Sequence, residues 1–392
     1  MKTLKDVDTN GKRVLMRADF NVPVKNGKIG DDTRIRAALP TIEKLLDDGA
    51  TLILMSHLGR PKGEVADEYR LEPVAKHLSE LLGKEVRYTK TAGPASSEQQ
   101  SFVADAPAGS VTLLENTRFD SREKTNDAEL ARILAGYAGV YVNDAFGAAH
   151  RAHASTEGVA HLLPSAAGLL LEKEIKTLGQ LIESPEKPFK VILGGAKVSD
   201  KIGVIENLLN VADEIFIGGA MAYTFFKAQG GEVGKSLVEE DKLDVALDVL
   251  ERAKSKNIKI HLPQDSVCAQ DIEEGVETAT YPSNEIPAGW MGLDIGPDAI
   301  KTFKDSLKDA RTILWNGPMG VFEISPFDKG TRAVAQTVAD LNGFTVVGGG
   351  DSVAAVNATG LDDKIDHIST GGGASLELLE GKTLPGVAAL SD

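Results

Sequence analysis

Short apolar runs rich in valine, isoleucine and leucine recur along the chain, each followed by a polar or glycine-rich turn and then by a stretch with helical periodicity. This alternation is typical of the βα units of parallel sheets, so the pattern predicts an α/β fold. The expected strands are residues 14–18, 51–55, 111–114 and 140–142 in the first half, and 190–193, 214–217, 258–262, 312–315 and 344–347 in the second half.

Between the two sets of runs lies one amphipathic segment, residues 169–185, which we interpret as a connecting helix. Its apolar positions recur at helical spacing: Leu171, Ile175, Leu178 and Ile182. Pro185 and Pro188 then end the helix. Two Rossmann-like lobes, each with a parallel sheet of four to six strands, fit 392 residues better than one very wide sheet. The expected lobes are residues 1–168 and 186–373.

The composition of the chain mainly excludes certain classes of protein and partner. With 42% hydrophobic and 26% charged residues the chain is an ordinary globular protein, and its net charge of −15 argues against nucleic acid or an anionic membrane as a partner. The single cysteine, Cys268, is expected to be a small buried apolar residue. No apolar run approaches the ~20 residues of a membrane span, and no signal-peptide pattern is present, so a cytoplasmic location is expected.

Candidate chemistry lies after the runs, because ligands bind at the carboxyl ends of strands in open α/β sheets. A single arginine there is more often a solvated charge or a structural ion pair. Several arginines in one crevice of an acidic protein would repel one another unless an anion lies among them. The first half therefore predicts a small substrate with more than one anionic group, near Asp19, Asn21, Arg36, His57, Arg60, Arg118, Asn143, Asp144, His150 and Arg151.

A metal site is the alternative interpretation of two of these positions. His150 and His153 fit an HxxH pair, but the chain has no HExxH-type motif to supply a further ligand. A histidine beside Arg151 is better placed for an anion than for zinc. We therefore favour the anion site.

Glycines take the place of arginines at the strand ends of the second half. One glycine-rich turn can serve only close packing of a strand and a helix. Five such turns point to main-chain N–H groups at helix N-termini that hold the phosphates of a nucleotide. They are GGAKVSDKIG, GGAMAYTF, NGPMGVFE, GGGDSVAAV and STGGGASLELL.

Two lysines and two acids accompany these turns. Lys197 and Lys201 are spaced i, i+4, so both ammonium groups can point toward phosphate oxygens, although most such pairs are simply solvated. Asp351 either caps the helix that it opens or binds a magnesium ion that bridges the phosphates, and Glu323 is a candidate for a ribose hydroxyl. Complete P-loop and GxGxxG fingerprints are absent, which disfavours P-loop ATPases and Rossmann dehydrogenases.

Eight motifs, in order and along essentially the whole chain, resemble those of phosphoglycerate kinases: RADFNVP, SHLGRPKG, LLENTRF, AHRAHAST, LGGAKVSDKI, WNGPMGVFE, GGGDS and STGGGASLELLEG. The resemblance implies a monomeric, two-lobed kinase that moves a phosphoryl group reversibly between 1,3-bisphosphoglycerate and ADP, giving 3-phosphoglycerate and ATP with Mg²⁺. It also implies that the C-terminal tail, residues 374–392, packs on the first lobe. The stretch DSREKTND after Phe119 lies outside the site motifs.

By this resemblance the first lobe holds the triose and the second lobe holds the nucleotide. The implied triose-binding residues are Asp19, Phe20, Asn21, Arg36, His57, Leu58, Gly59, Arg60, Arg118 and Arg151. The implied nucleotide-binding residues are Gly195, Lys197, Lys201, Gly219, Asn316, Pro318, Glu323, Gly349, Gly350, Asp351 and Ser352, with Asp351 as the metal ligand. The expected catalytic groups are Arg36, Lys197, Lys201, Gly350 and Gly373.

The implied chemistry needs no general base, since the phosphoryl acceptor is already ionised in both directions. Transfer needs alignment and positive charge, and closure of the lobes about a hinge would bring the ligands together and exclude water. Two alternatives remain open: a two-lobed receptor for phosphorylated sugars, which would not need a glycine-rich nucleotide site, and a kinase for another carboxylic acid. An assay with 3-phosphoglycerate against acetate or aspartate distinguishes the second alternative.

Overall fold

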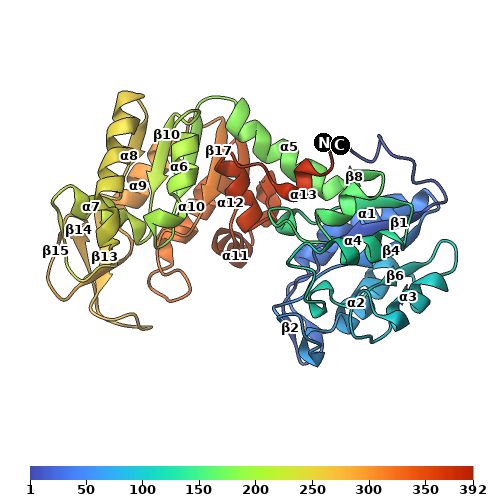
Figure 1. Cartoon of the computed structure of the whole chain (residues 1–392). Helices are drawn as coiled ribbons and strands as arrows, with labels where there is room; N and C mark the ends of the chain where they lie inside the picture. The colour runs from blue at the N-terminus through green and yellow to red at the C-terminus, as the bar shows by residue number, and fades with distance from the viewer. Residues whose placement is uncertain (392) are drawn as a thin grey trace. The chain divides into compact units, whose positions relative to one another are not determined.

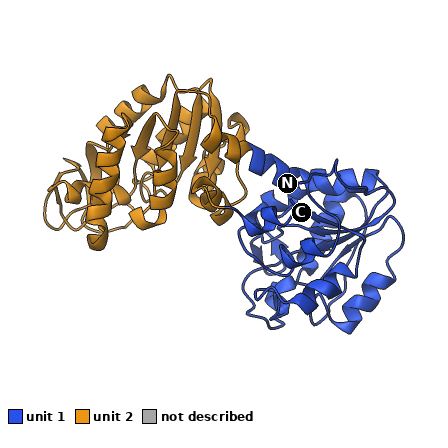
Figure 2. Cartoon of the chain, turned by 45° about the horizontal axis from the view of Figure 1, so that its top comes forward, with its two compact units in different colours: residues 1–176, 383–392 blue, residues 177–382 orange. Residues whose placement is uncertain are grey.

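The computed structural model describes residues 1–391 and contains two compact units, which we describe one at a time (Figures 1 and 2). Unit 1 comprises Met1–Lys176 together with Thr383–Asp392, and unit 2 comprises Thr177–Lys382. Unit 1 is therefore formed by two segments that are distant in the sequence (blue in Figure 2). Within the described residues, no helix is both long enough and apolar enough to cross a membrane.

Unit 1 is built on a six-stranded parallel sheet with the order β5-β6-β4-β1-β7-β8, which places β1 between β4 and β7. Its strands are β1 (Arg13–Arg17), β4 (Thr51–Met55), β5 (Val86–Arg87), β6 (Val111–Leu113), β7 (Val140–Asn143) and β8 (Ser165–Ala167), and a β2 (Val24–Lys25)–β3 (Lys28–Ile29) hairpin follows β1. Its α-helices are α1 (Thr33–Asp47), α2 (Glu72–Leu82), α3 (Ser97–Ala104) and α4 (Ala128–Ala135). Short 3-10 helices are η1 (Asp67–Tyr69), η2 (Thr117–Phe119), η3 (Phe146–Ala148) and η4 (Gly158–His161).

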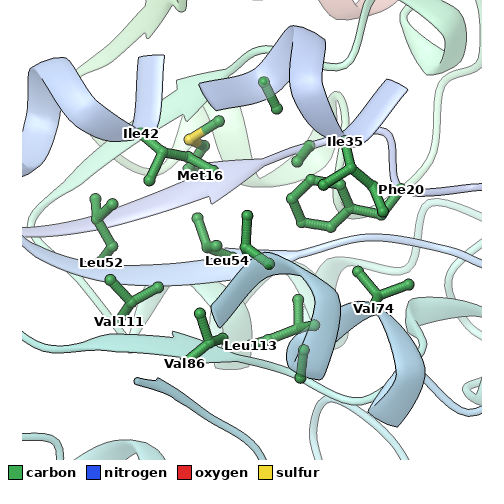
Figure 3. Packing of buried hydrophobic residues seen from close by; sticks show 14 of the residues in the cluster. Met16, Phe20, Ile35, Ile42, Leu52, Leu54, Val74, Val86, Val111 and Leu113 are labelled. Atoms are coloured by element: carbon green, nitrogen blue, oxygen red, sulfur yellow. The ribbon is translucent and has the colours of Figure 1, made fainter. Parts of the chain in front are cut away.

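One face of this sheet is covered by α1 and α2, as Figure 3 shows. Met16, Leu52 and Leu54 point from the strands toward Ile35 and Ile42 of α1. Strand residues on the opposite face, among them Leu15, Ile53 and Tyr141, are also fully buried. Burial on both faces explains why these strands appear in the sequence as continuous apolar runs rather than as an alternating pattern.

Unit 2 repeats this plan with a second six-stranded parallel sheet, ordered β12-β10-β9-β17-β18-β19. Its strands are β9 (Phe189–Leu193), β10 (Glu214–Ile217), β12 (Lys259–His261), β17 (Thr312–Asn316), β18 (Phe344–Gly348) and β19 (His367–Ile368). Its α-helices are α6 (Ile202–Leu208), α7 (Met221–Ala228), α8 (Leu243–Ser255), α9 (Pro297–Leu307), α10 (Lys329–Ala339), α11 (Gly350–Thr359) and α12 (Gly373–Leu379), and its 3-10 helices are η5 (Val198–Asp200), η6 (Glu240–Lys242) and η7 (Asp362–Lys364).

Two parallel sheets confirm the predicted fold class, and every predicted strand is present within a residue or two of its expected position. Several elements were not predicted. A three-stranded antiparallel sheet is formed by β13 (Asp265–Ala269), β14 (Thr278–Pro282) and β16 (Met291–Ile295), and a parallel pair by β11 (Glu232–Val233) and β15 (Glu285–Ile286). β14 is exposed or half-buried along its length, and β11 and β15 have two residues each. β13 and β16 are largely buried, but their sequences DSVCA and MGLDI contain polar residues and glycine, so they lack the apolar runs on which the prediction depends.

The predicted helix between the two sets of strands is α5 (Leu169–Glu183), and the division between the units falls within it, after Lys176. The chain returns to unit 1 at Thr383, later than residue 374, where the tail was expected to begin. The reason is that α12 belongs to unit 2, where Asn207 of α6 donates to the Leu379 carbonyl at 2.8 Å. The returning segment contains α13 (Pro385–Ala388) and pairs with unit 1 through Gly386 N–H to Ala149 O.

Candidate active site

The basic residues of unit 1 come together at one edge of its sheet because they follow adjacent parallel strands. Asp19, Phe20 and Asn21 follow β1, whose neighbours are β4 and β7. His57 to Arg60 follow β4, Arg118 lies in η2 after β6, and Arg151 follows β7 through η3. The order of the strands thus places these segments side by side at the carboxyl edge.

Several positive charges act on Arg118. Burial lowers the pKa of Arg118, and the positive charges of Arg17, Arg151 and Arg60 lower it further, while Glu123 opposes them. The Arg118 Nε atom is buried without a hydrogen-bond partner among residues 1–391. Such a cluster of like charges with an unused donor is stabilised by a bound anion.

His57 lies in the same cluster. Its pKa is well below the usual value because the ring is buried, and Arg17, Arg118, Arg34 and His153 lower it further. Burial likewise lowers the pKa of His153 to about 4. Guanidinium groups on several sides disfavour a metal cation here, so the surroundings of His153 support an anion site.

The main chain between β4 and η1 is held by side-chain amides. Asn21 Oδ1 accepts from Gly59 N–H at 2.9 Å, and Arg118 Nη1 donates to the Gly59 carbonyl at 3.0 Å. Asn116 Nδ2 donates to the Leu58 carbonyl at 2.8 Å. The side chains of Leu58 and Phe20 are buried, so they pack beneath the surface and support the main chain of the site.

Arg36 lies on α1 and stands apart from the buried cations. Its side chain is 59% exposed, and its Nε donates to Asp32 Oδ2 at 2.8 Å. It is not among the cations with the strongest effect on Arg118 or His57. The arginine of α1 that acts on His57 is Arg34, which donates to the Asn21 carbonyl at 2.9 Å. The sequence analysis named Arg36 and not Arg34, although both follow the first strand and lie on the same helix.

In unit 2 the glycine-rich turns line a cavity of about 570 Å³ at the carboxyl ends of β9, β17 and β18. Close approach of main chains requires glycine here. A Cβ at Gly219 would lie 2.7 Å from Gly195 N and 3.0 Å from Pro318 O, and Gly219 has a φ of +72°. The turn after β10 therefore lies directly against the main chain of the turns after β9 and β17, with no room for a side chain between them.

Lys201 is the buried cation of this cavity. Its side chain is 8% exposed and Nζ donates to Asn316 Oδ1. Burial lowers the pKa of Lys201, and the charges of Asp200 and Asp351 oppose that shift. Asn316 Nδ2 is buried without a partner among residues 1–391, so it is available to donate to a ligand. Lys197 also lines the cavity but is exposed.

The N-terminus of α11 forms another wall of this cavity. Gly349, with a φ of +90°, is the capping residue, and a Cβ on Gly350 would meet nothing within 4 Å. Asp351 lies in the first turn, is exposed, and does not cap the helix with its side chain. Ser352 is instead structural, since its Oγ accepts from Gly317 N–H at 2.6 Å. Gly373, the first residue of α12, lines the cavity as well.

A second, largely apolar cavity of about 280 Å³ adjoins the first and shares Gly195, Pro318 and Asp351 with it. Leu237 and Ile272 line it, although 56% and 47% of their surface is exposed. Glu323 lines this cavity, and so does Asp294, which the sequence analysis did not name. An apolar slot beside a glycine-lined cradle matches a planar base attached to a phosphate chain.

Comparisons with known proteins agree over the whole chain. Residues 4–382 match the family model described as phosphoglycerate kinase. Curated phosphoglycerate kinases of Moorella thermoacetica and Thermosipho africanus are both 58% identical to this chain, covering 100% of it and 99% and 98% of their own length. The solved structure of the Coxiella burnetii phosphoglycerate kinase matches with a TM-score of 0.90 at 41% identity, covering 99% of this chain and 98% of that one. The Pyrococcus horikoshii enzyme matches with a TM-score of 0.85 at 33% identity, covering 100% and 98%.

Proposed function

The chain belongs to the phosphoglycerate kinase family, and on that premise we propose which residues of each unit carry the reaction. The enzyme transfers a phosphoryl group reversibly between 1,3-bisphosphoglycerate and ADP, giving 3-phosphoglycerate and ATP in glycolysis. It is a phosphotransferase with a carboxyl group as acceptor.

Unit 1 is proposed to bind the triose. The charges around Arg118 support this assignment, because Arg17, Arg60 and Arg151 all act on it and only one carboxylate, Glu123, is among the strongest influences. Guanidinium forks match the oxygens of a phosphate and a carboxylate, and 3-phosphoglycerate has both. The proposed triose-binding residues are Asp19, Asn21, Arg36, His57, Gly59, Arg60, Arg118 and Arg151, with Phe20 and Leu58 in support.

Unit 2 is proposed to bind the nucleotide. The apolar slot would take the base, Glu323 the ribose, and the cradle of main-chain N–H groups the phosphates. Lys197, Lys201 and Asn316 supply the side-chain donors of the cradle. Gly195, Gly219, Pro318, Gly349, Gly350 and Ser352 shape it.

Asp351 is proposed to hold Mg²⁺. One exposed carboxylate beside a phosphate cradle fits this ion, which takes one or two carboxylates and completes its shell with phosphate oxygens and waters. The ion would neutralise charge on the nucleotide phosphates. No other group of this chain is needed to hold it in the proposed arrangement.

The residues then act by alignment and charge. A loose phosphoryl transfer state places negative charge on the migrating group, and both acceptors are already ionised. Lys201 and Lys197 would stabilise that charge from unit 2, together with the N–H groups near Gly350 and Gly373, and Arg36 from unit 1. Because the two ligands are proposed to bind to different units, transfer requires a state in which the units hold them in line.

The cation cluster around Arg118 is the observation that carries the assignment of unit 1, and calorimetry with separate ligands tests it. Arg118→Met should weaken binding of 3-phosphoglycerate by about tenfold or more and leave binding of Mg-ADP unchanged. Asn316→Leu should show the reverse. Loss of both ligands in one variant, or of neither, would contradict the division of labour.

We also propose that the enzyme acts as a monomer in the cytoplasm. The resemblance supports both statements. Light scattering of the purified protein tests the first, and a mass of twice the chain mass at working concentration would contradict it.

A further inference from the structure

Arg17 is a charged side chain that is wholly buried inside unit 1 and is not among the proposed triose-binding or catalytic residues. It is the last residue of β1, and its exposed fraction is 0%. Its guanidinium donates to three acceptors: Nε to Ser155 Oγ at 2.9 Å, Nη1 to the Ala18 carbonyl, and Nη2 to His57 Nδ1 at 2.9 Å. The last contact joins it to the proposed triose site.

The contact with Arg17 fixes the proton position on His57. A guanidinium can only donate hydrogen bonds, so Nδ1 of His57 must accept and cannot carry a proton. The neutral ring then has its proton on Nε2. The charged or titratable groups with the strongest effect on the ring are Arg17 of β1, Arg118 of η2, Arg34 of α1 and His153, and all of them disfavour a second proton. Nε2 has no partner within residues 1–391 and is left as a donor.

Arg17 in turn is held by a buried carboxylate through one hydroxyl group. Glu123, 1% exposed, accepts from Ser155 N–H at 2.8 Å and from Ser155 Oγ–H at 2.6 Å. Ser155 Oγ therefore accepts from Arg17 and donates to Glu123. A fully buried guanidinium is costly without a nearby negative charge, and Glu123 supplies it. Glu123 comes from the DSREKTND stretch that the sequence placed outside the site motifs.

We propose that Arg17 is a positioning residue that fixes His57 as its Nε2–H tautomer, and that Ser155 and Glu123 hold Arg17 in the orientation this requires. The proposal rests on the proposed function in one respect, which is that the triose is the anion that accepts from Nε2. A neutral, fixed N–H adds a directional donor to the cluster without adding another full charge. Since this bond forms in the bound state as well as during transfer, its loss should raise KM more than it lowers kcat.

The direct test is nitrogen NMR of ¹⁵N-histidine-labelled enzyme without ligand, which distinguishes a bare ring nitrogen from a protonated one. The wild type should show His57 with a bare Nδ1 and a protonated Nε2 at neutral pH. Arg17→Met should give a mixture of tautomers and titration closer to the usual histidine value, and should raise KM for 3-phosphoglycerate about tenfold. Arg17→Lys, which keeps one donor, should restore the single tautomer. A protonated Nδ1 in the wild type, or an unchanged ring in Arg17→Met, would overturn the proposal.

A milder pair of variants covers the case in which Arg17→Met fails to fold. Ser155→Ala keeps both charges and removes the bridging hydroxyl, whereas Ser155→Thr keeps it. The alanine variant should show mixed tautomers and a raised KM, and the threonine variant should match the wild type. A single unchanged tautomer in Ser155→Ala would refute the proposal that Ser155 holds Arg17 in place.

The ligand-free spectrum separates this proposal from the assignment of the triose site. If the tautomer is as expected but 3-phosphoglycerate does not shift the Nε2–H signal, the triose assignment fails and the positioning role stands. If the ligand shifts the signals of unit 1 but Nδ1 is protonated, the positioning role fails alone.

Discussion

Gly194→Ala adds one methyl group where the glycine-rich turns of unit 2 are most tightly packed, and so tests whether this packing stabilises the proposed nucleotide cradle. Gly194 follows β9, and a Cβ there would collide with the carbonyl oxygen of Pro318 and lie 2.7 Å from that of Gly317. Both obstacles are main-chain atoms, so no side chain can rotate away, and the ends of β9 and β17 must separate. Overpacking costs about 1–3 kcal/mol, and a rigid obstacle favours the upper end, so Gly194→Ala should lose about 3 kcal/mol.

Gly179 provides a matched control for the same chemical change. It lies within α5, and a Cβ there would meet nothing within 4 Å. Alanine is favoured over glycine inside a helix by about 0.5–1 kcal/mol. Gly179→Ala should therefore stabilise the enzyme. The same change from glycine to alanine thus raises the free energy of unfolding at one position and lowers it at the other.

Thermal unfolding and steady-state kinetics measure both effects. A loss of about 3 kcal/mol corresponds to a fall in Tm of about 6–12 °C for a domain of this size, and Gly179→Ala should raise Tm by about 1–4 °C. KM for ADP should rise in Gly194→Ala and stay unchanged in Gly179→Ala. A wild-type Tm for Gly194→Ala, or a similar fall in both variants, would refute the packing argument.

Further predictions concern charge. Lys201→Met removes the buried ammonium of the cradle and should lower kcat by about 10²–10³-fold. Lys301→Met, at an exposed position of α9, should leave kcat unchanged, and equal effects of the two substitutions would exclude a special role for Lys201. Because burial lowers the pKa of Lys201, kcat of the wild type should begin to fall at a pH below the ordinary pKa of lysine. Lys201→Arg should lack this decrease of kcat at high pH. Arg36→Ala should lower kcat by several orders of magnitude with a modest loss of 3-phosphoglycerate binding by calorimetry, and an unchanged kcat would refute that role. Burial raises the pKa of Asp144 to about 7. Folding thus favours its protonated form, and this stabilisation is lost as pH rises toward 7; Tm of Asp144→Asn should lack that decline, and parallel profiles would contradict it.

Strands that are buried on both faces were predictable, because they need continuous apolar runs, as in β1 and β4. Strands whose conformation depends on pairing with other strands were not predictable from the sequence. β5 has two residues, and β8 has the sequence Ser-Ala-Ala, which contains no apolar run. In β14 exposed and half-buried residues alternate, and the partner strands decide its conformation.

The site shows the same limit. Arg118 and the glycines at the strand ends were predictable because a parallel sheet collects the residues that follow its strands at one edge. Arg17 lies inside an expected strand, and its role was not predictable, because its partners Ser155 and Glu123 are more than a hundred positions away and only Glu123 carries a compensating charge. The sequence gives no indication of Asp294, and its place at the apolar cavity of about 280 Å³ follows from a sheet that was not predicted.

The late return of the chain to unit 1 has a consequence for biosynthesis. Lys2 N–H donates to the carbonyl of Leu390, and Gly386 N–H to that of Ala149, so early residues have partners that are translated near the end. At ~5–20 residues per second, a ribosome needs about 10–40 s to add the residues of unit 2 before those partners emerge. The nascent first unit must wait through that interval with one edge unfinished, and the second unit, whose residues are contiguous, can be completed first.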